Sequence, residues 1–556
     1  MEPLNKSCTG ATAPRHWLWL LLAVAVIWFG NIEYRKLIKP DEGRYAEIPR
    51  EMVVSGDWVT PRLNGLKYFE KPPLQYWATA TAYTVFGEHQ WTSRLWTALT
   101  GFAGLLLVWY AGTRLFGCAA GRYAAMLLGG SLLYVLMAHI NTLDMGVTFF
   151  ITLGVAGLLL GQQAESDART RRNWMYVAWA ALGLAVLSKG LMGLVLPGAA
   201  LFLYSVAQRD IAVWKRMHWG AGLLLFLLVT APWFYLVMQA NPEFFQRFFI
   251  YEHYLRFTTK VHARYQPWHY FIPVLLAGML PWTILMFDTL VRTWKNSARA
   301  DRAFNPERFL LIWTVFIYVF FSVSSSKLPS YLLPMFPALA LLMGKQVAEM
   351  NVRRLFWLVF PALPLGLLAL GLAPFTARLA DTPLQVQMYG EYAYWLAAAA
   401  LIWLLGTVSA WVFLRRDNKT VAVLALALGS LLAAQIGTSG YNIIAKERSA
   451  YLIADAIRPY VKADVPFYSV ADYEQTLPFY LKRTFTLVQY QDEMAFGIMQ
   501  EPQRWIPDIA SFAKVWQAQP EALAFMPVYM YQQLKQQELA MKIIFENTQY
   551  IVVSKP

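Results

Sequence analysis

The chain has 556 residues, of which 57% are hydrophobic and only 15% are charged. Soluble domains usually contain about 25% charged residues, so this composition excludes a soluble enzyme and indicates an integral membrane protein. The net charge of +14 does not indicate a nucleic-acid-binding protein, because lysine and arginine in membrane proteins collect beside the helices as topology signals.

Apolar segments long enough to cross a bilayer recur along most of the chain. A span needs roughly 20 mostly apolar residues, and this criterion predicts about 13 transmembrane helices. No small-residue cleavage site follows the first segment, which is therefore predicted to be a retained helix. The predicted spans lie near residues 17–37, 95–115, 121–138, 143–162, 174–189, 191–207, 217–239, 268–290, 309–324, 330–347, 355–373, 392–414 and 420–438.

The charges in the short loops predict the orientation. Alternate loops contain basic clusters, such as Arg169, Arg171 and Arg172, and the positive-inside rule assigns this face to the cytoplasm together with the N-terminus. An odd number of spans then places residues 440–556 on the outer side. Residues 1–439 form the predicted transmembrane domain.

The C-terminal segment lacks long apolar runs. The stretches "DVPFYSV", "TFTLVQY" and "IIFENTQYIVVS" are strand-like, whereas "EALAFMPVYMYQQLKQQELAMK" is helix-like. We therefore predict that residues 440–556 form a small α/β domain outside the membrane.

The first outer loop, residues 38–94, is long and rich in basic residues although it lies on the outer face. Such a cluster opposes the topology rule, so it requires carboxylate partners in the loop, an anionic ligand, or both. Apolar residues recur here at helical spacing and predict an amphipathic helix in the plane of the membrane interface. These residues are Tyr45, Ile48, Met52 and Val53.

Two interpretations are possible for the charges of this loop. Glu47 and Glu51 fit the solvated face of the predicted helix as surface ion pairs with Arg44 and Arg50. Asp41 and Glu42 differ, because they follow the span directly, near the membrane surface, where a carboxylate is costly unless it is used or paired. Spacing alone leaves a structural and a functional role open for these two residues.

Further charged residues lie at other outer helix ends. Asp144 begins a span in "HINTLDMG", Lys189 separates two spans in "LSKGLMG", and "SSSKLPSYLLP" contains Lys327 and Tyr331. The aromatic-rich loop near residue 250 adds Glu252, His253, Arg256, Lys260 and Arg264. Each is weak evidence alone, since aromatic residues also form interfacial belts and a single histidine is usually structural. Carboxylates gathered on one face with Lys71, Lys189 and Arg256 indicate a site for a phosphate.

Several motifs carry a family resemblance over essentially the whole chain. The stretches "DEGRYAEIPREM", "GDWVTPRLNGLKYFEKPPLQYW", "LDMG", "LSKGLMG" and "SSSKLPSYLLPMFPALALL" resemble the ArnT family of aminoarabinose transferases. This family is related to the protein O-mannosyltransferases and has the GT-C fold. The resemblance implies a mostly α, polytopic GT-C protein with interfacial helices in its first periplasmic loop and a periplasmic C-terminal domain. Many members of the family have threonine where this chain has Gly43.

The resemblance also implies a reaction. We expect an enzyme of the bacterial inner membrane that transfers 4-amino-4-deoxy-L-arabinose from undecaprenyl phosphate to phosphate groups of lipid A, by inversion, on the periplasmic face. The product carries less negative charge, which implies resistance to polymyxin and cationic peptides. The expected partners are this donor, lipid A and membrane lipids, without nucleic acid, and we expect a monomer.

The resemblance assigns roles to individual residues. Asp41, Asp144 and Glu70 are the expected catalytic acids, and Lys71, Lys189 and Arg256 the expected clamp on the donor phosphate. Glu42, Arg44, Tyr45, Tyr68, Lys327 and Tyr331 are expected to line the substrate pocket. An acceptor phosphate is already ionised, so Asp41 is expected to orient the acceptor, stabilise positive charge on the sugar, or pair with its 4-amino group instead of acting as a strong base.

No cofactor is expected to be required. A divalent metal on Glu70 or Asp144 with His253 stays open, although the chain has no HExxH motif. Another GT-C enzyme, such as a protein O-mannosyltransferase, is the main alternative function. A transporter is the alternative from another class, and it is disfavoured because the charges crowd one face instead of the bilayer midplane.

Overall fold

The computed structural model describes residues 15–163, 167–255, 266–297 and 304–556. The chain divides into two compact units. Unit 1 contains residues 1–34 and 94–443, and unit 2 contains residues 35–93 and 444–556. This grouping differs from the predicted division near residue 440, because the first loop belongs with the C-terminal segment and not with the transmembrane helices. Segments distant in sequence share one unit, which chain order does not reveal.

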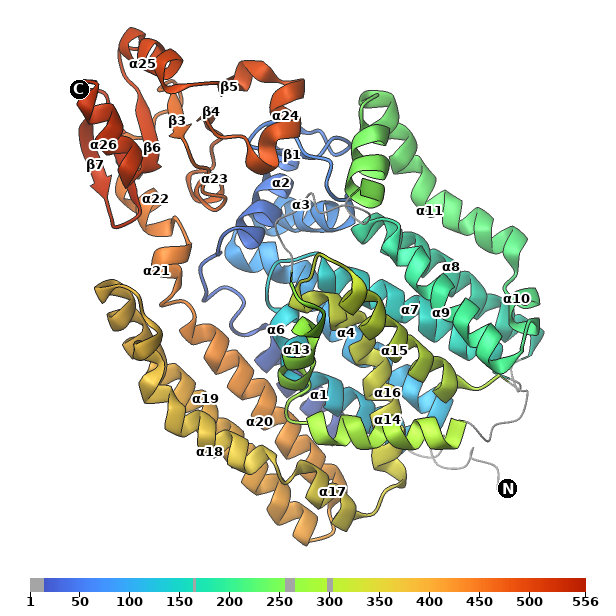
Figure 1. Cartoon of the computed structure of the whole chain (residues 1–556). Helices are drawn as coiled ribbons and strands as arrows, with labels where there is room; N and C mark the ends of the chain where they lie inside the picture. The colour runs from blue at the N-terminus through green and yellow to red at the C-terminus, as the bar shows by residue number, and fades with distance from the viewer. Residues whose placement is uncertain (1–14, 164–166, 256–265, 298–303) are drawn as a thin grey trace. The chain divides into compact units, whose positions relative to one another are not determined.

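Unit 1 is built from helices (Figure 1). Its α-helices are α1 (Arg15–Phe29), α4 (Gln90–Phe116), α5 (Cys118–Gly129), α6 (Leu132–Ala138), α7 (Asp144–Gln162), α8 (Ala168–Lys189), α9 (Met192–Gln208), α10 (Ala212–Lys215), α11 (Trp219–Ala240), α13 (Phe271–Gly278), α14 (Thr283–Ser297), α15 (Pro306–Val323), α16 (Phe336–Glu349), α17 (Val352–Val359), α18 (Ala362–Leu372), α19 (Pro383–Arg415) and α20 (Lys419–Gly440). Short π or 3-10 segments are η1 (Gln246–Leu255), η2 (Trp268–Tyr270), η3 (Pro329–Met335) and η4 (Ala373–Leu379).

Every span predicted from the sequence overlaps helical residues. Among the described residues, eight helices are long and apolar enough to cross a membrane, and up to ten if each of two bent pairs is one span. The chain is therefore a multi-pass membrane protein of mostly α structure, as predicted. The number of about 13 spans stays a prediction, because α1, α8 and α9 do not meet the same criterion of length and composition.

Two predicted spans are not single straight helices. Residues 121–138 form α5 and α6, which meet at 67°, and residues 268–290 lie on a pair that meets at 111°. Gly129 ends α5 and Gly130 follows it in the first break, and Pro281 lies in the break of the second pair. Glycine lowers helix propensity and proline removes a backbone donor, so an apolar run interrupted by them bends.

Small residues bring α19 and α20 together. A Cβ added to Gly406 would lie 2.8 Å from the Cα of Gly429, and the reverse substitution meets the same obstacle. The missing side chains let the two backbones approach, and close packing is what holds helices together in an apolar surrounding.

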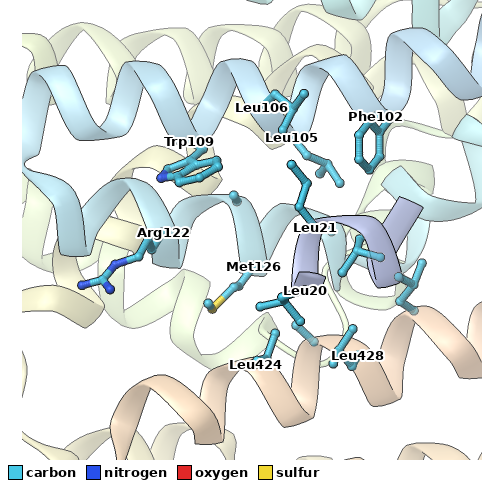
Figure 2. A pocket seen from close by; sticks show the side chains of 15 residues that line it. Leu20, Leu21, Phe102, Leu105, Leu106, Trp109, Arg122, Met126, Leu424 and Leu428 are labelled. Atoms are coloured by element: carbon cyan, nitrogen blue, oxygen red, sulfur yellow. The ribbon is translucent and has the colours of Figure 1, made fainter. Parts of the chain in front are cut away.

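Unit 1 also contains an apolar groove of about 120 Å³ between α1, α4, α5 and α20 (Figure 2). Leu20, Leu21, Phe102 and Leu428 line it, and Arg122 lies at its edge. Such a lining suits hydrocarbon and offers little to a sugar or a phosphate. The candidate catalytic residues are elsewhere.

Unit 2 combines the first loop with a mixed sheet. Its strands are β1 (Arg62–Leu63), β2 (Leu66–Lys67), β3 (Phe467–Val470), β4 (Thr486–Val488), β5 (Trp505–Ile506), β6 (Leu523–Pro527), β7 (Lys542–Glu546) and β8 (Tyr550–Ser554). Its helices are α2 (Asp41–Ser55), α3 (Leu74–Phe86), α21 (Ala445–Arg448), α22 (Tyr451–Ile457), α23 (Leu477–Leu481), α24 (Ala495–Gln500), α25 (Ile509–Ala518) and α26 (Val528–Gln536), with short 3-10 segments η5 (Arg458–Tyr460), η6 (Asp492–Met494) and η7 (Pro502–Arg504).

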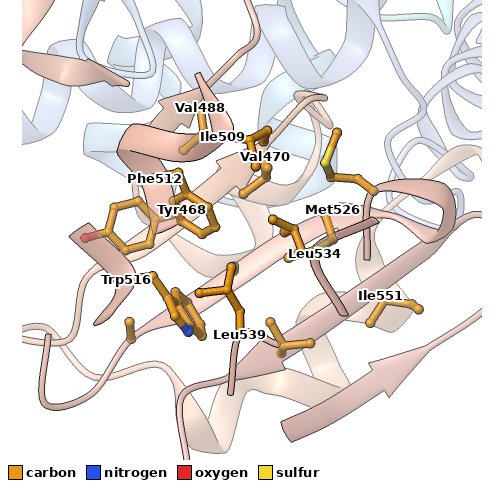
Figure 3. Close-up of a cluster of buried hydrophobic side chains, with 14 residues drawn as sticks. Tyr468, Val470, Val488, Ile509, Phe512, Trp516, Met526, Leu534, Leu539 and Ile551 are labelled. Carbon is orange, nitrogen blue, oxygen red and sulfur yellow. The ribbon is translucent and has the colours of Figure 1, made fainter. Parts of the chain in front are cut away.

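The larger sheet has the order β5-β4-β3-β6-β8-β7. Strands β5, β4, β3 and β6 are parallel, whereas β8 is antiparallel to both β6 and β7. Buried side chains from α25, α26 and the strands form its core, among them Phe512, Trp516 and Leu534 (Figure 3). The predicted α/β character of this segment is confirmed.

One element of this segment differs from its prediction. The helix-like stretch from Glu521 contains strand β6 before helix α26 begins at Val528. Residues Leu523 to Met526 are all buried, and a short, fully buried apolar run has the same appearance in a central strand and in a buried helix.

Helix α2 forms where the sequence predicts a helix, but its surroundings differ. The sequence places four charged residues on a solvated face, but all of them are buried: Arg44, Glu47, Arg50 and Glu51. Arg50 donates to both carboxylate oxygens of Glu47, at 2.7 and 2.5 Å, and Glu51 accepts from the backbone N–H of Gly65 at 2.7 Å. The solvated-face interpretation is wrong, because β1, α3 and α23 pack on this helix.

Candidate active site

The candidate residues of unit 2 gather around Arg44, on the first turn of α2. Its guanidinium donates to Asp41 at 3.2 Å and forms an ion pair with Glu493, which lies in η6 of the C-terminal segment. Gln475 donates to the other oxygen of Glu493 at 2.9 Å. The helical spacing of Asp41 and Arg44 places both side chains on one face of α2. Arg44 is thereby held between an accessible and a buried carboxylate.

Aromatic rings surround this guanidinium. It lies 5.9 Å from the ring centres of both Tyr45 and Tyr68, and the Tyr68 hydroxyl lies 3.4 Å from a carboxylate oxygen of Glu493. Tyr45 in turn stacks on Tyr76 at 6.2 Å. Rings beside a cation stabilise it through their negative faces, and they present flat apolar surface to a sugar.

Burial shapes the electrostatics of this cluster. It raises the pKa of Glu493, while the charge of Arg44 acts in the opposite direction. Burial also raises the pKa of the Tyr68 phenol, so this hydroxyl stays protonated as a hydrogen-bond donor. The cluster therefore combines one fixed cation with donors that keep their protons.

The two carboxylates predicted at the start of α2 are in different situations. The Asp41 side chain is 37% exposed, whereas Glu42 is only 1% exposed and accepts from the backbone N–H of Ile38 at 3.2 Å. Asp41 can therefore meet a substrate. Glu42 has a structural contact, and its place in the substrate pocket stays a prediction.

Glu70 and Lys71 follow β2 in the same unit. The Lys71 ammonium donates to the backbone carbonyl of Glu70 at 2.9 Å, and Glu70 acts electrostatically on Arg44. Both residues are partly exposed.

The candidate residues of unit 1 gather where two helices end. Asp144 is the first residue of α7, Lys189 is the last of α8, and their side chains form an ion pair. Each charge suits the dipole of its own helix end. The Lys189 ammonium also lies 5.2 Å from the ring centre of Tyr331. A cation, an acid and a ring predicted from separate motifs are therefore neighbours.

Lys327 is buried and is held by backbone carbonyl groups. It is 4% exposed and donates to the backbone carbonyl oxygens of Gln266, at 2.9 Å, and Ser324. These contacts brace the chain before η3. Its assignment to the substrate pocket stays a prediction.

Part of the predicted site lies outside the described residues. Arg256, Lys260 and Arg264 belong to the undescribed range 256–265, and the side chain of His253 is likewise not described. Nearby, Arg247 pairs with Glu252 at 3.0 Å. In the part of the chain that the structure describes, no three His, Cys, Asp or Glu side chains are grouped to hold a metal ion. A metal on Glu70 or His253 stays a prediction.

Sequence reasoning missed three residues of the Arg44 cluster. Glu493 and Gln475 lie in the segment that the sequence predicts as a separate domain, and Tyr76 lies in α3. No spacing rule connects Glu493 with Arg44. The aromatic character of "LQYW" was the one signal available for Tyr76.

Two family models and several solved structures match this chain. Residues 453–555 match the family described as aminoarabinose transferase C-terminal domain, and residues 70–236 match that described as dolichyl-phosphate-mannose-protein mannosyltransferase. A crystal structure of ArnT from Cupriavidus metallidurans bound to undecaprenyl phosphate is similar over 98% of this chain and 99% of its own, with 37% identity and a TM-score of 0.93.

The chain belongs to the ArnT family. Curated relatives in this family are named undecaprenyl phosphate-alpha-4-amino-4-deoxy-L-arabinose arabinosyl transferases. The one from Edwardsiella ictaluri is 33% identical over 60% of this chain, and the one from Aeromonas salmonicida 35% over 57%. These alignments span about 60% of the curated relatives' own length.

The fold extends beyond the ArnT family. An archaeal oligosaccharyltransferase from Archaeoglobus fulgidus matches 93% of this chain with a TM-score of 0.51 at 12% identity. That likeness concerns the fold alone. The GT-C fold class predicted from the sequence is confirmed.

Proposed function

We propose that this protein transfers 4-amino-4-deoxy-L-arabinose from undecaprenyl phosphate to phosphate groups of lipid A. The observation that carries the proposal is the match along nearly the whole chain to an ArnT structure bound to undecaprenyl phosphate. The names of the curated relatives support the same sugar and the same carrier lipid.

The chemistry needs a cation where the donor bond breaks. The sugar leaves a phosphate on which negative charge builds, while its anomeric carbon becomes oxocarbenium-like. We assign the stabilisation of the leaving phosphate to Lys189, with Lys71 and Arg256 as further members of the clamp. Asp144 positions Lys189 through their ion pair.

Asp41 is assigned to the sugar side of the reaction. Its carboxylate is accessible and is oriented by its contact with Arg44. A fixed negative charge stabilises positive charge on the sugar ring and pairs with a cationic 4-amino group. The acceptor phosphate oxygen is already ionised and needs no strong base. The proposal assigns no step to a metal or other cofactor.

The proposed location is the bacterial inner membrane. The basic clusters in alternate loops support a cytoplasmic N-terminus, with the active site and the C-terminal segment in the periplasm. A lipid-borne donor and a lipid acceptor both reach such a site laterally from the bilayer. Loss of negative charge on lipid A would weaken the binding of cationic peptides such as polymyxin.

The test is a transfer assay with purified protein in detergent. Undecaprenyl phosphate-linked aminoarabinose and lipid A are incubated with the protein, and mass spectrometry follows the aminopentose added to lipid A. A product absent from the no-enzyme control supports the proposal. Consumption of the donor without a modified lipid A would contradict the acceptor assignment.

A second candidate follows from one observation. Residues 70–236 match the model of a dolichyl-phosphate-mannose-protein mannosyltransferase, so a protein hydroxyl is the alternative acceptor. A serine- and threonine-containing peptide offered with a polyprenyl-phosphate mannose donor distinguishes the two. Glycopeptide formation in place of modified lipid A would favour this alternative.

A further inference from the structure

A polar hollow of about 390 Å³ opens at one edge of the large sheet of unit 2. Its lining includes Lys39, Asp472, Tyr529, Gln549 and Tyr550. All of these residues belong to unit 2, and none is among the residues predicted or assigned to catalysis. The volume is in the range of small-ligand sites, about 300–1,000 Å³.

The position in the sheet is one where ligands are typically bound. Strands β4 and β6 both pair in parallel with β3, on its two sides, so the order of the strands reverses at β3. Open α/β sheets bind ligands beyond the carboxyl ends of the strands at such a reversal. The hollow lies there, since Asp472 follows the end of β3 and Pro527 ends β6.

The chain turns sharply to present Asp472. Ala471, the residue after β3, has a φ of +60°, a conformation that alanine rarely adopts. Residues on both sides hold the turn. Ser469 donates to the backbone carbonyl of Asp472 at 2.6 Å, and the N–H of Tyr473 donates to the Asp472 side chain at 2.7 Å. A positive φ at a residue other than glycine costs conformational free energy, so it persists only where the surrounding structure imposes it. Such backbone conformations are frequent at ligand sites.

Three side chains form a polar chain along the wall of the hollow. The Lys39 ammonium donates to the Tyr550 hydroxyl at 2.9 Å, and this hydroxyl donates to Asp472 at 2.8 Å. Lys39 also lies 4.8 Å from the centre of the Tyr550 ring. One cation and one anion thus face the hollow together, which does not favour a strongly charged ligand such as a nucleotide.

The lining has the chemistry of a sugar site. Tyr529 is 60% exposed and offers a flat ring on which the C–H face of a pyranose packs. The Asp472 carboxylate and the Gln549 amide are acceptors and donors suited to neighbouring hydroxyls. Hydrocarbon chains are disfavoured, because most of the lining side chains carry a polar group.

The hollow lies close to Asp41 along the chain. Lys39 precedes Asp41 by two residues, so their Cα atoms are separated by at most about 7.6 Å. The lining of the hollow therefore includes a residue two positions from the group assigned to the reaction. A donor lipid has one sugar, whereas an acceptor glycolipid has further rings to place there.

We propose that this hollow binds a sugar ring of the acceptor glycolipid and so positions its phosphate for transfer. The inference rests on the proposed function. It assigns to the C-terminal sheet a role in acceptor recognition, separate from the chemistry at Asp41 and Lys189.

Two variants test the site in the full-length protein. Tyr529→Ala removes the exposed ring, and Asp472→Asn removes the charge while keeping the shape. We expect each to raise the KM for lipid A about tenfold, with kcat and the donor KM changed less than twofold. Tyr460→Ala is the matched control, because Tyr460 is a 48% exposed tyrosine of the same unit outside the hollow. It leaves all three parameters unchanged.

A binding measurement separates this inference from the proposed function. Saturation-transfer NMR uses a soluble glucosamine disaccharide, without acyl chains or phosphates, and the protein in a detergent that contains no sugar. Signal transfer should occur with the wild type and the Tyr460→Ala control and be lost in both hollow variants. If the wild type is active, either of two results in the hollow variants overturns the inference. One is an unchanged KM for lipid A, and the other is a retained NMR signal from the disaccharide. A wild type without transferase activity overturns the proposed function, and the NMR result then decides whether the hollow binds sugar.

Discussion

Arg44, at the start of helix α2, forms a buried ion pair with Glu493 of the C-terminal segment. The two residues come from opposite ends of the chain and lie in the same compact unit. Because Arg44 also holds Asp41, the C-terminal segment takes part in positioning the residue that we assign to the sugar. The C-terminal segment is thus part of the support of the candidate site.

Removal of one partner of this pair should destabilise the protein. Glu493→Gln leaves the guanidinium of Arg44 buried with reduced compensation, and such a change costs about 3–5 kcal/mol. Thermal unfolding of the detergent-solubilised protein measures the effect. Glu521→Gln is the control, because the Lys462–Glu521 pair is more than half exposed on both sides and its loss should leave the melting temperature unchanged. Equal melting temperatures for Glu493→Gln and wild type would contradict a structural role.

Asp41→Asn should abolish most transfer while preserving the fold. The variant keeps the shape of the side chain and removes its charge, and Arg44 retains Glu493 as a partner. We expect kcat to fall about 100-fold, as for other groups that stabilise charge in a transition state. Asp455→Asn, at a 65% exposed ion-paired aspartate of the same unit, is the matched control. Nearly full activity of a folded Asp41→Asn protein would exclude the catalytic role.

Lys189→Gln should mainly lower kcat. The proposed role of Lys189 is to stabilise a phosphate as its charge increases, which is worth about 10² to 10³ in rate. Lys189→Arg keeps the positive charge and the ion pair with Asp144, so we expect its kcat to lie between those of Lys189→Gln and the wild type. Lys345→Gln removes a lysine that pairs with Glu307 at 2.6 Å in the same unit, and activity should persist. A kcat above half of wild type in Lys189→Gln would exclude the clamp role.

Gly43→Thr, a change toward the residue that many ArnT family members have, should destabilise this chain. A Cβ at Gly43 would lie 2.5 Å from the backbone carbonyl oxygen of Gln475, a distance that real Cβ atoms essentially never show. Overpacking of this kind costs about 1–3 kcal/mol. The melting temperature of Gly43→Ala, which has the same obstructed Cβ, should fall as well. At Gly198 an added Cβ meets nothing within 4 Å, so Gly198→Ala is the control. An unchanged melting temperature in both Gly43 variants would show that the two backbones can separate.

The stability of unit 2 should decrease as pH rises through neutrality. Burial, followed by the charge of Glu47, raises the pKa of Glu51 to about 8. Since the unfolded glutamate titrates near pH 4.3, the folded state binds the proton more tightly. The stabilisation that comes from the proton on Glu51 is complete below about pH 4.3. It is lost as the pH rises through the folded-state pKa of about 8. Glu51→Gln should flatten the dependence of the melting temperature between pH 5 and 9. Glu546 is exposed, so Glu546→Gln is the control and should keep the wild-type dependence of the melting temperature on pH. The same dependence in Glu51→Gln would contradict the role of Glu51.

The sequence determined much of this protein by local rules. Long apolar runs led to the helices of unit 1, and residues at helix ends, such as Asp144 and Lys189, were recognised as candidates before their contact was known. Strands β3, β4, β7 and β8 followed from their apolar patterns and turn residues. These features depend on neighbours along the chain, which is why composition and spacing suffice to predict them.

The tertiary structure decided what depends on distant segments. Glu47, Arg50 and Glu51 carry full charges and therefore suggested a solvated face, yet packing from other elements buries them. The pairing of Arg44 with Glu493, the obstruction beside Gly43 and the hollow that joins Lys39 to the end of β3 arise in the same way. Such contacts join segments through space, and no periodicity along the chain encodes which distant backbone will lie beside a given side chain.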